Sequence, residues 1–231
     1  MQKWMTFASE YIKERGKKTK AVFIFDMESE IGITSKKGIK QFSFDDYIGE
    51  YDRIVFSVLV SSGVKENSFI KKYLSELVSN VSGNDIELCA ECIENYKEFL
   101  ANPLELLQKV CENMVRSDGA PFSYDKTKEE VEYLIWLSQI KTIYPHLEEY
   151  REDFVRKYAS SIKKQLPISA SYGEVYEDPK DVELDTLKYM VDNGYITLTT
   201  MEYERLKRFK EARNRLSHLS FLLLDEIRAI I

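Results

Sequence analysis

The segment TTMEYERLKRFKEARNRLSHLSF (residues 199–221) predicts the last long helix of the chain. Thr199 and Glu202 have the spacing of a capping box, in which two side chains satisfy backbone N–H groups at the start of a helix. Leu206, Phe209 and Leu216 fall on one side of a helix at about 100° per residue. The segment therefore predicts a helix, or a pair of helices, with one face in a hydrophobic core.

Arg213 falls inside this apolar stripe, which Leu223 and Ile227 extend if the helix is unbroken. A guanidinium at the edge of a core requires anionic partners or a route to a cavity. Arg213 is therefore expected to have a specific role.

His218 falls about 200° away from Leu216 on the same helical wheel, with Asn214 one turn before it. Phe221 and Leu222 flank the histidine. A histidine among apolar side chains on the side away from the core indicates burial against another chain. We therefore expect a homodimer that brings two copies of this region together.

The same segment is rich in cations, although the whole chain has a net charge of −6. A local excess of positive charge attracts phosphates even on an acidic protein. The expected RNA-binding residues are Arg205, Lys207, Arg208, Lys210 and Arg215, in addition to Arg213.

The run Arg213-Asn214-Arg215-Leu216-Ser217-His218 resembles the signature of the HEPN superfamily: an arginine, a polar residue and then a histidine, late in an all-α bundle. Proteins of this family are commonly dimeric, metal-independent RNases of toxin–antitoxin, phage-defence and CRISPR-associated systems. Others have lost activity and bind partners or nucleotides. The resemblance implies a homodimeric endoribonuclease without metal or cofactor, with Arg213, His218 and Asn214 as catalytic residues and an antitoxin or regulatory protein as a possible partner.

The residue types suit that chemistry. Cleavage of RNA without metal requires a group that moves a proton at the attacking 2′-hydroxyl or the leaving oxygen, and histidine is suited to this near neutral pH. Arg213 would place positive charge on the phosphate in a fork geometry. Asn214 would orient His218 or the phosphate. The resemblance implies a 2′,3′-cyclic phosphate product.

The first third of the chain contains the strand signals. Strands are expected at residues 21–25, 39–44 and 53–60, because these runs are rich in β-branched and aromatic residues. The fold class is therefore α+β or α/β and mostly helical, with a small α/β unit at 1–82 and a HEPN-like helical bundle at 83–231.

Helix boundaries are marked by capping residues and prolines. Asn67 or Ser68 is expected to cap the helix that follows, and Pro103 to start another in its first turn. Thr127 and Glu130 form a further capping-box pattern, whose helix is expected to continue past Pro145.

Composition indicates a globular protein, with 44% apolar residues. The first residues form a basic amphipathic helix rather than a signal peptide, and no run is long enough to span a membrane. Cys89, Cys92 and Cys111 are an odd number, which favours reduced thiols and a cytoplasmic location.

Other motifs have ordinary explanations beside functional ones. Cys89-Ala-Glu-Cys92 with Cys111 allows a zinc site, but buried thiols are the simpler interpretation. Asp26, Glu28 and Glu30 allow a magnesium site or an acidic turn. Ser61-Ser62-Gly63 allows a phosphate-binding loop or a plain connection. No chemistry is assigned to His146, and Tyr133 and Trp136 are expected in the core.

Two alternatives to the nuclease remain open. The stretch ITLTTMEYERLKRFKEARNRL (196–216) also resembles the helix of winged-helix DNA binders, in which its cations would contact phosphates. The chain could also be an interaction protein, for example a neutralising partner of a toxin, without any contact to nucleic acid.

Overall fold

The computed structural model describes residues 2–14, 24, 40, 42, 47–169 and 173–231, and these are mostly helical. They divide into two compact units, Met1–Gly49 and Glu50–Ile231. In the first unit, helix α1 (Gln2–Glu14) confirms the amphipathic N-terminal helix. The strands expected at 21–25 and 39–44 lie outside the described residues, apart from single positions.

In the second unit, the segment expected as a strand at 53–60 is a helix, α2 (Glu50–Ser61). Its buried side is made of serines: the Ser61 and Ser75 hydroxyls lie 2.6 Å apart, and Ser57 Oγ lies 3.4 Å from Cys89 Sγ. These small side chains let α2 pack closely on its neighbours, while Val58 remains exposed. The prediction was wrong because a short apolar run has no period that separates strand from helix.

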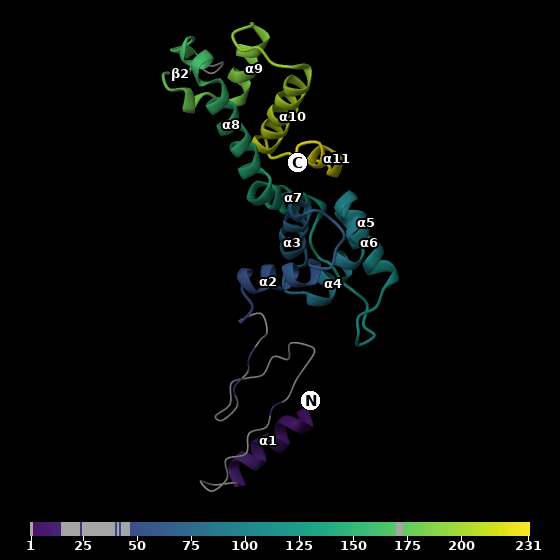
Figure 1. Ribbon diagram of the computed structural model, residues 1–231. Helices are drawn as coiled ribbons and strands as arrows, with labels where there is room; N and C mark the ends of the chain where they lie inside the picture. The colour runs from purple at the N-terminus through teal and green to yellow at the C-terminus, as the bar shows by residue number, and fades with distance from the viewer. Residues whose placement is uncertain (1, 15–23, 25–39, 41, 43–46, 170–172) are drawn as a thin grey trace. The chain divides into compact units, whose positions relative to one another are not determined.

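Four further helices follow α2 in the chain order shown in Figure 1: α3 (Ser68–Ser82), α4 (Ile86–Glu94), α5 (Tyr96–Ala101) and α6 (Pro103–Asn113). Asn67 caps α3, since its side chain accepts a hydrogen bond from the Ile70 N–H. Pro103 starts α6 as expected. α3 packs against α2, α4 and α7, so the expected boundary at 82/83 runs between two packed helices of one unit.

Helices α7 (Lys128–Thr142) and α8 (Tyr144–Lys163) meet at Ile143. The capping box of Thr127 and Glu130 is present, and Pro145 lies in the first turn of α8, so a new helix begins where one continuous helix was expected. Beyond α8, β1 (Ile168–Ser169) pairs with β2 (Val175–Tyr176) in an antiparallel ladder. The short 3₁₀ helix η2 (Pro179–Asp181) then leads into α9.

The last helices are α9 (Leu184–Asp192), α10 (Thr200–Ser217) and α11 (Leu224–Arg228). α10 packs against α7, α8 and α9, and η2 packs on α8. One continuous core joins these elements, and its largest fully buried side chains are Phe99, Phe209, Ile70, Leu74, Leu77, Leu88, Ile143, Leu147, Ile162, Leu184, Leu187 and Met190.

Glu202, the acid of the α10 capping box, also links α10 to α8. Lys157 Nζ lies 2.5 Å from Glu202 Oε1, and the Tyr158 hydroxyl donates to the same atom at 3.1 Å. The hydrogen bond from Lys157, followed by those from Thr199, lowers the pKa of Glu202 to about 2 from its ordinary 4.5. The carboxylate is therefore the form that the folded state favours.

This lowered pKa predicts an acid-dependent loss of stability. A carboxyl whose folded pKa is depressed adds stability above its unfolded pKa, and that stability is lost as the pH falls through the folded pKa. We expect Glu202→Gln to lower the thermal midpoint at pH 7 and the difference from the parent protein to vanish as the pH falls from about 4.5 to about 2. Thermal melts across this range measure it, with Glu204→Gln as control, and a difference independent of pH would contradict the assignment.

Candidate functional site around the end of helix α10

Helix α10 begins as the sequence predicts. Both halves of the Thr199–Glu202 capping box are present, and Leu206, Phe209 and Leu216 are fully buried. The helix ends at Ser217, with His218 as its C-cap.

Because α10 ends at Ser217, the side-chain directions that were expected for a helix continuing to Ile227 do not apply. Leu223 is 56% exposed instead of buried, whereas Ile227 is buried from the separate helix α11.

A tight turn follows α10 at residues 217–222. The His218 backbone N–H donates to the Asn214 and Arg215 carbonyls, and the Ser220 N–H donates to the Arg215 carbonyl at 3.0 Å. Leu219 has a φ of 57°, in the left-handed region that a non-glycine residue rarely adopts. The turn is thus a defined structure.

Side chains of α7 form hydrogen bonds with the backbone at both ends of this turn. The Trp136 indole N–H donates to the Leu216 carbonyl at 2.7 Å. The buried Gln139 amide accepts from the Leu222 N–H at 2.7 Å and donates to the Leu222 carbonyl at 2.9 Å and to the Tyr73 hydroxyl at 3.0 Å. These bonds position the backbone on either side of His218.

The His218 side chain itself is exposed. Within the part of the chain that the structure describes, its imidazole makes no hydrogen bond or ion pair. His218 is thus an exposed residue on a turn whose backbone is held by several hydrogen bonds.

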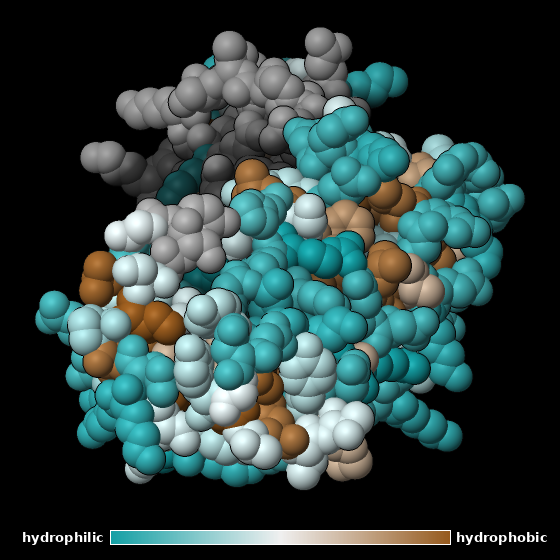
Figure 2. Space-filling model, turned by 90° about the horizontal axis from the view of Figure 1, so that it is seen from above, coloured by the Kyte–Doolittle hydropathy of each residue, from teal (hydrophilic) through white to brown (hydrophobic). Residues whose placement is uncertain are grey.

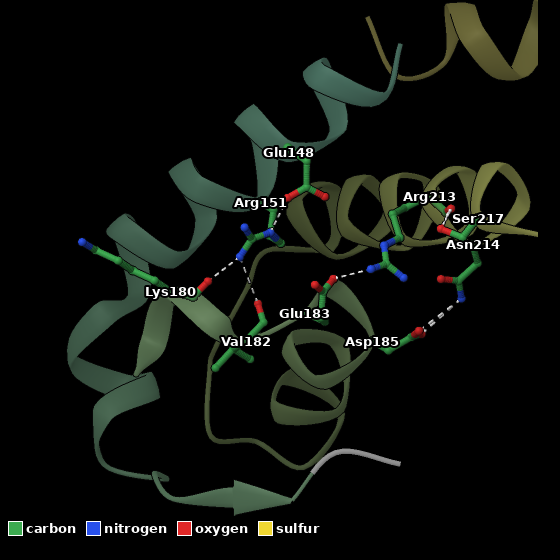
Figure 3. A network of polar contacts seen from close by, with 9 residues as sticks. All are labelled: Glu148, Arg151, Lys180, Val182, Glu183, Asp185, Arg213, Asn214 and Ser217. Carbon is green, nitrogen blue, oxygen red and sulfur yellow. Dashed lines mark hydrogen bonds and ion pairs between the residues drawn. The ribbon is translucent and has the colours of Figure 1, made fainter. Parts of the chain in front are cut away.

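Arg213 and Asn214 point toward the start of α9 (Figure 3). Arg213 Nη2 donates to Glu183 Oε2 at 2.8 Å, and the Asn214 amide donates to Asp185 at 3.2 Å. The Arg213 Nε is buried and has no partner among the described residues. Acids are favourable in this place because the N-terminus of a helix carries partial positive charge. The expected anionic partner of Arg213 is therefore a carboxylate of the same chain.

The cations expected to bind RNA do not form one surface. Lys210 pairs with Asp185 at 3.0 Å, and Arg215 pairs with Glu226 of α11. Arg205 lies over the Tyr150 ring of α8, 5.3 Å from its centroid. Arg208 donates to the Ala229 carbonyl at 3.3 Å, and Lys207 is exposed. Only Lys210 lies with Arg213 and Asn214 against α9, so the positive charge is spread around the helix.

The other histidine supports the packing. His146 Nε2 lies 3.0 Å from the Ile230 carbonyl, and its ring lies between Phe69 and Phe209, at 5.2 and 5.6 Å from their centroids.

The alternative motifs gain no support from their surroundings. Cys89 and Cys92 are buried free thiols, and burial raises the pKa of both, which disfavours the thiolate that zinc requires. No group of three or more possible metal ligands occurs among the described residues. Ser61 is buried at the end of α2, where its hydroxyl pairs with that of Ser75, while Ser62 and Gly63 are exposed in the turn that follows. The acids at positions 26, 28 and 30 lie outside the described residues.

Sequence reasoning missed the residues that surround the site. Glu183 and Asp185 stand in a polar stretch before a helix, and a search for acids near the start of α9 would have marked them as capping candidates. Gln139 carries no such signal, because a glutamine within a helix usually faces solvent. Its role depends on a contact 83 residues away in the chain.

Comparisons with known proteins identify no relative: no protein family, curated protein or solved structure matches the chain. In the described part of the chain, no helix combines the length and apolar character needed to cross a bilayer.

Proposed function

We propose that this protein is a metal-independent endoribonuclease of the HEPN type that cleaves single-stranded RNA. His218 and Arg213 are the catalytic residues, and Asn214 orients them. The observation that carries the proposal is the exposed imidazole of His218, which has no partner among the described residues and lies on a turn whose backbone is held on both sides by Trp136 and Gln139. Such support is what a proton-transfer group requires, because its position must be set before the substrate arrives.

In the proposed reaction, the 2′-oxygen attacks the phosphorus and the bond to the 5′-oxygen breaks. A proton leaves the 2′-hydroxyl and another reaches the 5′-oxygen, and His218 serves one of these transfers. Arg213 stabilises the negative charge that builds up on the phosphate. Arg213 now binds Glu183, so the phosphate would take the place of one carboxylate as its partner, and the guanidinium would remain paired throughout.

The proposal includes a homodimer that covers the surface beside His218. Leu219 is 71% exposed and Leu223 56% exposed on the segment that follows α10. Tyr133, which the sequence analysis expected in the core, is instead 55% exposed on α7, where its ring packs on Trp136. Exposed apolar side chains of this kind favour cover by another protein surface, and a second copy would place two His218 residues in one groove.

RNA would be guided to this groove by the electrostatic field of the cations around α10, namely Arg205, Lys207, Arg208, Lys210 and Arg215. The finer fold assignment, a HEPN-like bundle preceded by a small N-terminal unit, belongs to the same proposal. So do a cytoplasmic location, which suits the unpaired thiols, an antitoxin or regulatory partner, and a role in antiviral defence.

The test is the chemistry of the products. Purified full-length protein is incubated with single-stranded RNA in excess chelator, and the ends are analysed by mass spectrometry. We expect 2′,3′-cyclic phosphate and 5′-hydroxyl ends. Products with 3′-hydroxyl and 5′-phosphate ends, or cleavage that requires added divalent metal, would refute the proposal.

A second function is favoured by the hydrogen bonds of Arg213 and Asn214. Both side chains bind carboxylates of α9, which is a structural role in holding α9 on α10. In that case the chain is a non-catalytic module for binding nucleic acid or protein. It would give no cleavage products, and Arg213→Ala would lower the thermal midpoint while His218→Ala would leave it unchanged.

A further inference from the structure

A pocket of about 580 Å³ lies between α8 and the η2 segment, and His218 does not line it. This volume is in the range of pockets that hold small organic molecules. One wall is the face of α8 that carries Val155 and Ala159, and the opposite wall is formed by Asp178, Pro179 and Lys180.

Cations dominate the polar lining of this pocket. Arg151, Arg156, Lys163 and Lys180 line it, against the acids Glu152 and Asp178. The Asp178 carboxylate already accepts the Lys180 backbone N–H as the cap of η2. The residues that line the pocket therefore carry more positive than negative charge, in a protein whose net charge is negative.

Arg151 is the fixed member of the group. Its Nε donates to Glu148 at 2.7 Å and its Nη1 to the Lys180 carbonyl at 2.7 Å, which joins α8 to η2 (Figure 3). The side chain is only 16% exposed. The guanidinium is thus held in place at the wall of the pocket, and its Nη2 makes no hydrogen bond among the described residues.

The other three cations are available to a ligand. The side chains of Lys163 and Lys180 have no partner within the described part of the chain, and Arg156 makes only an exposed pair with Asp153 at 3.2 Å. Figure 2 shows the molecule from above relative to Figure 1. On this face hydrophilic residues predominate, and hydrophobic residues form small separate patches. Cations around an apolar floor are the combination that a phosphorylated organic molecule requires.

We propose that this pocket binds a small phosphomonoester, up to the size of a nucleoside monophosphate. The phosphate would lie among Arg156, Lys163 and Lys180, where charge-assisted hydrogen bonds replace its hydration. The organic part would lie on Val155, Ala159 and Pro179. A pocket of this size favours a small molecule over a long RNA strand, which would need a continuous track of cations.

Isothermal titration calorimetry of the full chain tests the proposal, with AMP as the probe and adenosine and inorganic phosphate for comparison. We expect AMP to bind with a dissociation constant at or below about 1 mM. Adenosine should bind at least about tenfold more weakly, because it lacks the charged group. Equal binding of AMP and adenosine, or no binding of AMP, would overturn the proposal.

Substitutions identify the pocket. Lys163→Ala and Lys180→Ala should each weaken AMP binding by about tenfold, the loss of one charge-assisted hydrogen bond. Lys164→Ala is the matched control, since this exposed neighbour does not line the pocket, and it should change binding less than about twofold. Arg151 is left intact because its removal would break the hydrogen bond that joins α8 to η2.

Two further outcomes complete the test. If AMP binds but Lys163→Ala and Lys180→Ala have no effect, the ligand lies elsewhere and the assignment is wrong. If these variants weaken binding of a single-stranded RNA without terminal phosphate as much as that of AMP, the pocket belongs to an RNA surface and the small-ligand assignment also falls. His218→Ala should not change AMP binding, so this test is independent of the proposed nuclease.

Discussion

Replacement of His218 by alanine is expected to slow RNA cleavage by about 100- to 10,000-fold, the usual contribution of a positioned proton-transfer group. The folded protein should be unaffected, because the imidazole is exposed and makes no hydrogen bond among the described residues. Exposed substitutions of this kind change stability by less than about 0.5 kcal/mol. The rate of formation of cyclic-phosphate ends measures the first effect, and a thermal melt measures the second.

Ser220→Ala is the matched control for this experiment. Ser220 is an exposed residue of the same turn, and its backbone N–H donates to the Arg215 carbonyl, a hydrogen bond that alanine retains. Cleavage should therefore stay within about twofold of the parent rate. Cleavage that survives His218→Ala at the parental rate would remove the histidine from the mechanism.

Gln139→Leu is expected to lower the free energy of unfolding by about 3 kcal/mol. The side chain is fully buried and forms hydrogen bonds with the Leu222 N–H, the Leu222 carbonyl and the Tyr73 hydroxyl. Leucine has a similar size but leaves three buried polar groups without partners, each at a cost of about 1 kcal/mol or more. Urea denaturation followed by circular dichroism gives the free energy.

Two variants test whether the loss of stability comes from these three hydrogen bonds or from the replacement of any glutamine by leucine. Tyr73→Phe removes one of the three hydrogen bonds and should cost about 1 kcal/mol. Gln108→Leu changes an exposed residue of α6, whose amide donates to Glu112, and should change stability by less than about 0.5 kcal/mol. A loss below 1 kcal/mol for Gln139→Leu would mean that the turn does not depend on this amide.

Helix starts were predictable because their signals are local. The side chains of Asn67, Thr127 and Thr199 each accept a hydrogen bond from a backbone N–H three residues ahead, so the cap is complete within one turn of chain. Pro103 starts α6 for an equally local reason, since proline lacks the N–H that a first turn leaves unpaired.

The α2 segment was not predictable from local signals. Its run of Val, Ile, Leu and Phe suits a strand as well as a helix. Ser57 and Ser61 face α3 and α4, and this contact between small residues selects the helix. These contacts join residues that are 32 and 14 positions apart in the chain, so the apolar run by itself does not reveal them.

For the candidate site, sequence was sufficient to select Arg213, Asn214 and His218 and to place them within about one helical turn, because residue identity and helical spacing are local properties. Their present partners follow from the packing of α9 and α7 against α10. That packing brings Glu183 to Arg213 and Asp185 to Asn214, and it places Gln139 under the turn that carries His218. Ion pairs and buried hydrogen bonds depend on distances in space, and separations of 29, 30 and 83 residues along the chain are closed only when the helices pack.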